Sequence, residues 1–263
     1  MKEGEILEKR TSRLYRLIKW LVRLFYPKIQ VIGSENLPQE PAIIVGNHAQ
    51  LHGPIACELY FPGNRYTWCA GQMMQLQQVP AYAYQDFWSG KPKYIRWFYK
   101  ILSYIIAPLS VCIFSNAQTI GVYHDTRIIS TFKNTVNRKG EGASVVIFPE
   151  CDTPHNHIVY TFQENFVDVA KLYRKRTGKS PAFVPMYIAP NLKQIHIGTP
   201  IYFDPEAPIS LERSRICEYL MDAITAIAVS LPEHTVVPYR NMPKKDYPAN
   251  TSREVPLHEN TGG

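Results

Sequence analysis

Short apolar runs, each followed by a helical pattern, are the feature that most restricts the fold of this chain. Four of them have the length of a strand and are largely apolar: AIIVGN (42–47), RYTWCA (65–70), ASVVIFPE (143–150) and AFVPMYIA (182–189). Strands buried on both faces have this composition, and helices between them favour parallel pairing. The sequence therefore predicts an α/β fold, with a mostly parallel central sheet flanked by helices on both faces.

Weaker patterns complete this alternation. Further strands are predicted at 28–33, 119–123 and 195–203, and helices at 54–61, 127–138, 162–176 and 211–231. Ligands of such sheets bind where the strands end at their carboxyl edge. Polar residues just after a strand are therefore the first candidates for a site, and His48, Asp125 and Glu150 stand at such positions.

The segment RLYRLIKWLVRLFY (13–26) predicts an amphipathic N-terminal helix. Its apolar stripe comprises Leu14, Leu17, Ile18, Leu21, Leu24 and Phe25, and its opposite face carries Arg16, Lys19 and Arg23. Trp20 lies at the boundary. An apolar stripe with a basic back is typical of a helix that lies in the plane of an anionic membrane surface. The alternative is a helix that packs on its own domain.

The net charge of +7 and the pI near 9.1 favour an anionic partner. The basic residues cluster on the N-terminal helix and at 174–179, and they match no known groove-reading motif. We therefore expect a membrane surface or a phosphorylated substrate, and no nucleic acid. Five scattered cysteines without a C-x-x-C pair predict no disulfide framework, which fits the reducing cytoplasm.

The most hydrophobic stretch, 94–114, is interrupted by Arg96, Lys100 and Pro108. No apolar run reaches eighteen or more uninterrupted residues, and no signal peptide is recognisable. The sequence thus predicts neither export nor a membrane span. An interfacial helix and a buried core helix both remain open for this stretch.

Two histidines four residues apart, His48 and His52, stand in the run VGNHAQLHGP (45–54). Such a pair binds a metal when a helix carries it, but Gly46, Gly53 and Pro54 favour a loop here, so no metal is expected. Nucleotide-binding fingerprints and the G-x-S-x-G nucleophile motif are absent as well.

With these kinds of site set aside, we expect His48 to act as an acid–base catalyst. A neutral histidine at a strand end, beside Asn47 that can fix the loop, can take the proton of an alcohol that attacks a thioester. This reaction needs no cofactor.

Four sequence blocks support this interpretation. V-G-N-H (45–48) follows the entry V-I-G-S-E-N-L-P (31–38), and G-V-Y-H-D-T-R (121–127), V-I-F-P-E (146–150) and V-P-M-Y-I (184–188) come later. In order and spacing they resemble the lysophospholipid acyltransferase family, over residues 28–205.

The resemblance implies His48 as the general base, Arg127 as a contact for the acceptor phosphate, and Glu150 as a residue that organises the acceptor site. Pro149 and Pro185 would shape strand ends. The further substrate-binding candidates are Asn47, His52 and Asp152. The family implies an acyl-CoA or acyl-carrier-protein donor, a lysophospholipid-like acceptor, no cofactor, and a peripheral position on the cytoplasmic, inner face of the cell membrane.

Two departures from the family pattern matter. The first motif of the family is H-x-x-x-x-D, and Gly53 stands at the aspartate position. Loss of a carboxylate that orients a catalytic histidine commonly costs orders of magnitude in rate. The candidate replacements are His52, Asp125, Glu150 and Asp152. A catalytically weak or inactive lipid-binding relative is therefore the alternative function.

The second departure follows FPE, where Cys151, Asp152 and Thr153 replace the usual G-T-R. A basic residue of the motif is thus missing, and the histidines that could supply charge are His124, His155 and His157. The domain boundaries we predict are a membrane-associating helix (1–27), an acyltransferase domain (28–232) and a polar C-terminal tail (233–263).

Overall fold

The computed structural model describes residues 12–123 and 127–252 and divides into two compact units. The first unit comprises the chain up to Pro27 together with Tyr66–Thr131, and the second comprises Lys28–Arg65 and the chain from Phe132. Residues 66–131, which the sequence assigns to the catalytic domain, thus group with the N-terminal helix.

The sheet of the second unit has the strand order β1-β9-β8-β2-β5. These strands are β1 (Gln30–Ile32), β2 (Ile43–Gly46), β5 (Ser144–Ile147), β8 (Ala182–Ala189) and β9 (Gln194–Ile197). β2 pairs with β5 and β8 in parallel, as β1 does with β9, whereas β9 runs antiparallel to β8. The prediction of a mixed α/β fold with a mostly parallel sheet is confirmed.

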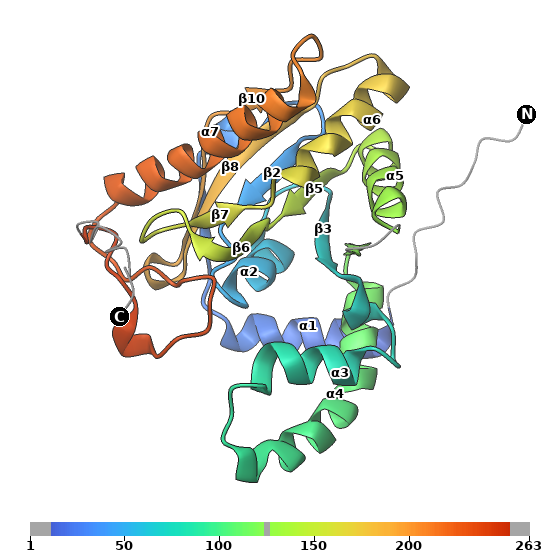
Figure 1. Cartoon of the computed structure of the whole chain (residues 1–263), viewed down its shortest axis with the longest axis vertical. Coiled ribbons are helices and arrows are strands. Elements are labelled where there is room, and N and C mark those ends of the chain that lie inside the picture. The colour runs from blue at the N-terminus through green and yellow to red at the C-terminus, as the bar shows by residue number, and fades with distance from the viewer. Residues whose placement is uncertain (1–11, 124–126, 253–263) are drawn as a thin grey trace, which may run out of the picture. The chain divides into compact units, whose positions relative to one another are not determined.

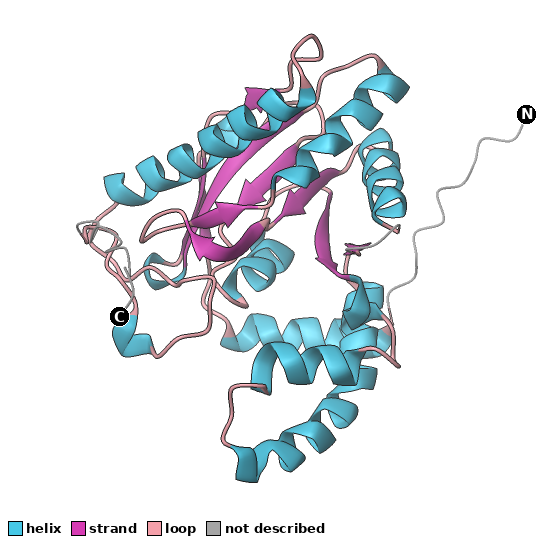
Figure 2. Cartoon of the chain, in the orientation of Figure 1, coloured by secondary structure: helices cyan, strands magenta, loops and turns pink. Residues whose placement is uncertain are grey.

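Helices flank this sheet. They are α2 (His52–Tyr60), α5 (Ile128–Gly140), α6 (Val169–Thr177) and α7 (Ile209–Ser230). α7 runs along β8 (Figures 1 and 2). Every residue of β2 and β8 is buried, as expected of central strands in a covered parallel sheet. The continuous apolar runs at 42–47 and 182–189 therefore form the middle of the core.

The predicted strand at 195–203 is wrong in one respect, because it is broken in two. β9 ends at Ile197, and β10 (Ile201–Tyr202) pairs separately with the first residues of β8. Opposite the break lies Pro185, whose carbonyl oxygen accepts a hydrogen bond from Gly198 N. Proline has no N–H for the ladder, so a proline inside a sheet is found at such irregularities.

The predicted helix at 162–176 is also shorter than expected. A two-stranded sheet of β6 (Glu150–Pro154) and β7 (Tyr160–Phe162) precedes a 3₁₀ turn at Glu164–Asp168, and only then does α6 begin. The polar sequence of 150–160 contains no strand alternation, which explains why pattern analysis missed the hairpin.

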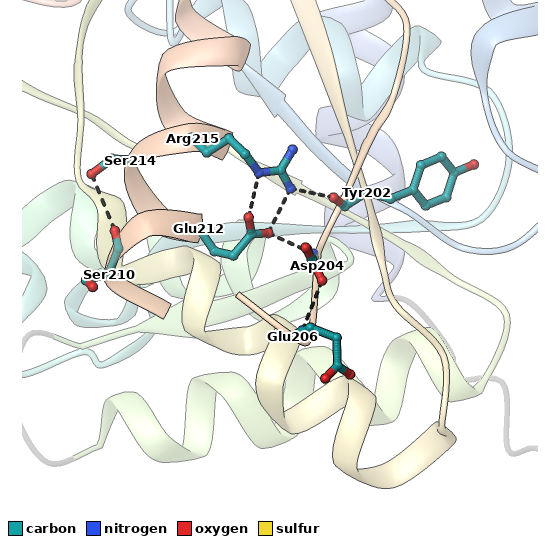
Figure 3. Close-up of polar contacts among 7 residues, drawn as sticks. All are labelled: Tyr202, Asp204, Glu206, Ser210, Glu212, Ser214 and Arg215. Atoms are coloured by element: carbon teal, nitrogen blue, oxygen red, sulfur yellow. Dashed lines mark hydrogen bonds and ion pairs between the residues drawn. The ribbon is translucent and has the colours of Figure 1, made fainter. Parts of the chain in front are cut away.

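A buried carboxylate holds the start of α7 (Figure 3). Glu212, 1% exposed, accepts two hydrogen bonds from Arg215 and one from the main-chain N–H of Asp204. Arg215 also donates to the carbonyl oxygen of Tyr202. A buried charge is tolerated when it is paired and hydrogen-bonded in this way. The network joins β10 to α7.

The first unit contains α1 (Arg13–Phe25), β3 (Arg65–Ala70), α3 (Val79–Ala83), α4 (Arg96–Asn116) and β4 (Thr119–Val122), with β3 and β4 parallel. Ser12 caps α1 by accepting a hydrogen bond from Tyr15 N, and its own N–H donates to Asn116 at the end of α4. Only Tyr15 of α1 is buried.

Much of the apolar surface of this unit is exposed. On α1 the exposed residues are Leu14, Leu17, Trp20, Leu21, Leu24 and Phe25, and in and just before α4 they are Tyr94, Trp97, Phe98, Ile101, Tyr104, Ile105 and Leu109. Residues 93–116 are the one helical stretch among the described residues that is long and apolar enough to cross a membrane, by length and composition alone. The expectation that Arg96, Lys100 and Pro108 make this stretch too short to cross a membrane is therefore wrong by length and composition. Arg96 and Lys100 lie in the first turns, and the helix continues through Pro108.

The C-terminal residues 232–252, here called the C-terminal strap, are folded back onto the second unit. Val236 N donates to Pro248 O, and Asn250 N donates to His234 O. The Asn250 side chain is 1% exposed and donates to the carbonyl oxygens of Ala228 and Leu231 at the end of α7. Through Ser252, the predicted polar tail is thus a folded part of the unit.

Candidate active site

His48 stands in a tight turn directly after β2. The next two residues, Ala49 and Gln50, have φ angles of 46° and 55°, although neither is glycine. The turn closes with hydrogen bonds from His52 N to Ala49 O and from Gly53 N to His48 O, and α2 follows. Left-handed conformations of residues with a Cβ are costly and gather at functional sites. The turn is therefore the first structural sign of a site.

The His48 side chain is held among aromatic rings. Its ring centroid lies 5.3 Å from that of Phe148 and 5.9 Å from that of Tyr239, both in edge-to-face geometry. Its Nδ1 atom is buried and has no hydrogen-bond partner within the described residues. Burial lowers the pKa of His48, and interactions with the main chain of Gln50 and of His48 itself oppose this only in part. The imidazole is therefore neutral near pH 7.

Glu150 ties the His48 turn to the β6–β7 hairpin. One carboxylate oxygen accepts the His48 main-chain N–H at 2.5 Å, and the other accepts the Tyr160 N–H at 2.9 Å. The side chain is 3% exposed. The V-G-N-H and F-P-E blocks thus meet in space, and the Glu150 carboxylate bonds to the main chain of His48 and not to its ring nitrogens.

Titration of Glu150 gives a first prediction. Burial raises the pKa of Glu150 to about 7. The two hydrogen bonds from main-chain N–H groups favour the charged form and oppose this rise only in part. A carboxyl group with a raised pKa stabilises the fold below its unfolded pKa, and this contribution is lost as pH rises through the folded pKa. Relative to Glu150→Gln, the free energy of unfolding of the wild type should therefore fall by roughly 1–3 kcal/mol between about pH 4.5 and pH 7.

Urea unfolding of both proteins at pH 5, 6, 7 and 8 measures this difference. Because the glutamine does not titrate, the other carboxylates cancel in the comparison. A difference between the two proteins that stays constant across the series would contradict the raised pKa.

Asn47 locks the end of β2 to β8. Its Oδ1 accepts the Ile188 N–H at 2.7 Å, and its Nδ2 donates to the Ile188 carbonyl oxygen at 3.1 Å. The residue is 2% exposed. The amide therefore acts like an extra backbone link that fixes the position from which the His48 turn departs, and its contact with a substrate stays a prediction.

Gly53 has no room for the carboxylate that the family pattern would place there. A Cβ built on Gly53 would come closer to the His48 carbonyl oxygen than real Cβ atoms come, and 3.0 Å from the Phe148 ring. The residue is buried at the start of α2. The tight turn and the Phe148 contact thus require glycine.

The charged residues around the turn come partly from the strap. Arg240 Nε lies 4.0 Å from Asp152 Oδ1, and both side chains are exposed. His52 is half-buried, and its pKa is lowered by burial and by the charge of Lys244. The strap thus brings two basic residues, Arg240 beside Asp152 and Lys244 near His52, to this part of the unit.

The other histidines considered as sources of charge point to different partners. His155 lies 3.6 Å from Asp222, and His157 Nε2 lies 3.2 Å from the carbonyl oxygen of Asn250. His124 and Asp125 lie outside the described residues.

Arg127 belongs to the first unit, where its guanidinium lies 3.9 Å from the centroid of the Tyr123 ring. Its predicted contact with the acceptor phosphate stays a prediction. Pro149 is buried beside Glu150, and its carbonyl oxygen accepts a hydrogen bond from Gln163 N. Within the described residues, no group of three or more His, Cys, Asp or Glu side chains could hold a metal ion.

Two aromatic residues of the site, Phe148 and Tyr239, are absent from the candidates predicted from the sequence. Phe148 stands inside the V-I-F-P-E block, two residues before Glu150, and this position was a usable signal. Tyr239 belongs to no block, and the sequence around it gives no sign of its contact with His48.

No protein-family model matches the sequence, and no curated protein matches it. Among solved structures, a similar one is the crystal structure of the 1-acyl-sn-glycerophosphate (LPA) acyltransferase PlsC from Thermotoga maritima. The match covers 83% of this chain and 81% of that chain, with 15% sequence identity and a TM-score of 0.47.

Proposed function

We propose that the chain is an acyltransferase. It moves a fatty acyl group from an acyl thioester, carried by coenzyme A or acyl-carrier protein, to a hydroxyl of a lysophospholipid-like acceptor. The observation that carries the proposal is the His48 turn, a strained strand-end loop that holds a half-buried imidazole with a buried Nδ1 atom and a lowered pKa. Glu150 of the F-P-E block fixes the main chain of this turn.

The reaction requires a neutral base and no cofactor. The imidazole of His48 takes the proton of the acceptor hydroxyl while that oxygen attacks the thioester carbonyl carbon. The tetrahedral intermediate then breaks its carbon–sulfur bond, and the imidazolium returns the proton to the leaving thiolate. The products are an ester and a free thiol, so protons and electrons balance.

Release of the thiol tests the activity directly. Purified protein is given a labelled acyl-CoA with a panel of lysophospholipids, which includes 1-acylglycerol-3-phosphate, and with no acceptor. We expect thiol release and a labelled diacyl product only when an acceptor is present. Equal thiol release with and without acceptor would indicate a thioesterase and contradict the proposal.

We further propose that the first unit binds the cytoplasmic face of the membrane peripherally. The support is the apolar surface of α1, on which Leu17 and Leu24 are 53% and 61% exposed, together with its basic residues. A lipid surface would bury these side chains and attract the charges.

The double change Leu17→Glu/Leu24→Glu should weaken binding to vesicles with anionic lipids roughly tenfold or more, because it removes buried apolar area and adds negative charge. Sedimentation with vesicles measures the bound fraction. Leu211→Glu, at an exposed position of α7, is the matched control and should bind as the wild type. Undiminished binding of the double variant would contradict a role for this face.

A second candidate function is a lipid-binding relative of low activity. The observation that favours it is the His48 Nδ1 atom, which has no carboxylate partner within the described residues. For this candidate, the same panel would yield saturable lysophospholipid binding without thiol release.

A further inference from the structure

The C-terminal strap reaches the His48 turn through defined contacts. Gln50, two residues after His48, donates from Nε2 to the hydroxyl of Tyr247 at 2.8 Å and to the carbonyl oxygen of Arg240 at 3.4 Å. Asn250 fixes the far end of the strap to α7. Val236 N, before Tyr239, donates to Pro248 O, so the strap is held by hydrogen bonds on both sides of Tyr239.

Tyr239 bridges the two elements that form the site. Its ring centroid lies 5.9 Å from that of His48, at an interplanar angle of 77°, and 5.7 Å from that of Tyr160 in β7. Phe148 contacts His48 at 5.3 Å and 64°. Edge-to-face contacts at such distances are the preferred geometry of aromatic pairs. The imidazole is therefore restrained by two rings that come from different parts of the chain.

No carboxylate side chain fits at position 53, where the family pattern has the partner of the histidine. Gly53 has no space for a side chain beside Phe148, and Glu150 bonds to the main chain of His48. We propose that Tyr239 is a positioning residue which, with Phe148, holds the His48 imidazole in the place of a carboxylate. This inference deepens the proposed function and rests on it, because it assigns the task of orienting the general base to aromatic contact.

Restraint by rings differs chemically from restraint by a carboxylate. A carboxylate stabilises the imidazolium, whereas aromatic rings exclude water without adding charge, and exclusion of water favours the neutral imidazole. This agrees with the lowered pKa of His48. Removal of the Tyr239 ring should therefore admit water and raise the pKa of His48 toward its ordinary value.

NMR titration of the His48 ring protons measures this pKa without any need for turnover. The proteins are the wild type, Tyr239→Ala, Tyr239→Phe and a control, Tyr202→Ala, at an exposed tyrosine of β10. The charged and titratable groups near the turn are the same in all four proteins, namely His52, Glu150, Asp152, Tyr160, Arg240, Lys244 and Tyr247. A difference in the titration of His48 therefore belongs to the substituted ring.

We expect the pKa of His48 to rise in Tyr239→Ala and to stay at the wild-type value in Tyr239→Phe and Tyr202→Ala. In the thioester assay, kcat of Tyr239→Ala should fall about tenfold with KM for the donor within twofold, and the acid limb of its pH profile should move up. Unchanged titration in Tyr239→Ala, or a loss in Tyr239→Phe equal to that in Tyr239→Ala, would overturn the proposal.

The two proposals fail separately. If the wild type transfers no acyl group, the proposed function fails, and the titration of His48 still decides whether Tyr239 controls its environment. If Tyr239→Ala does not fold, Tyr239→Leu keeps an apolar side chain in the same place and removes the aromatic edge. A wild-type titration and wild-type kcat in Tyr239→Leu would overturn the positioning role.

Discussion

Replacement of His48 by alanine is expected to lower kcat/KM for acyl transfer by about 10²–10⁴-fold, the range lost when a general base is removed. The imidazole is the group in the strained turn after β2 that is neutral near pH 7 and can take the acceptor proton. The measurement is the rate of thiol release in the presence of the best acceptor, compared with the acceptor-free rate.

A matched histidine distinguishes chemistry from folding. His196→Gln replaces a half-buried histidine of β9 that bonds to Gln194, and it should keep wild-type turnover. Circular dichroism and thermal unfolding of His48→Ala should match the wild type within a few degrees. Undiminished turnover in a folded His48→Ala protein would eliminate the mechanism.

Restoring the aspartate of the family pattern should harm this protein. Gly53→Asp is expected to lower the free energy of unfolding by about 3 kcal/mol or more, because its Cβ meets the His48 carbonyl oxygen and its charge would be buried. Activity should fall with it, since the His48 turn must shift. Chemical unfolding at pH 7 measures the first effect, and the thioester assay measures the second.

Gly53→Ala distinguishes the steric effect of a side chain at position 53 from the effect of a buried charge. Alanine in a helix normally stabilises by up to about 1 kcal/mol relative to glycine. Here we expect a loss of about 1–3 kcal/mol, because the extra methyl group overpacks the turn. A stabilised Gly53→Ala protein, or a Gly53→Asp protein with increased turnover, would contradict the steric reading of this position.

The strands whose limits could be predicted from the sequence are runs of largely apolar residues. Segment 182–189 is buried along its whole length, and its limits agree with β8. The limits of β3 at 65–70 also agree. In contrast, β6 is largely polar and β7 has only three residues, so local pattern did not reveal them.

Of the candidate site, His48 and Glu150 could be predicted from the sequence, and Tyr239 could not. Strand-end position identified His48 and Glu150, and the structure brings them together through a hydrogen bond. That the Glu150 carboxylate accepts this hydrogen bond from the main-chain N–H of His48 depends on the turn that follows β2. The contact between His48 and Tyr239 depends on the path of the strap, which no local pattern encodes.

The strap also sets the time at which the site can be completed in a newly made chain. Gln50 and Tyr247, which join the turn to the strap, are 197 residues apart in the sequence. At ribosomal rates of about 5–20 residues per second, the turn is made roughly 10–40 s before its partner. Every strand of the sheet is synthesised before the strap, so during translation the base is present while the ring that restrains it is still to come.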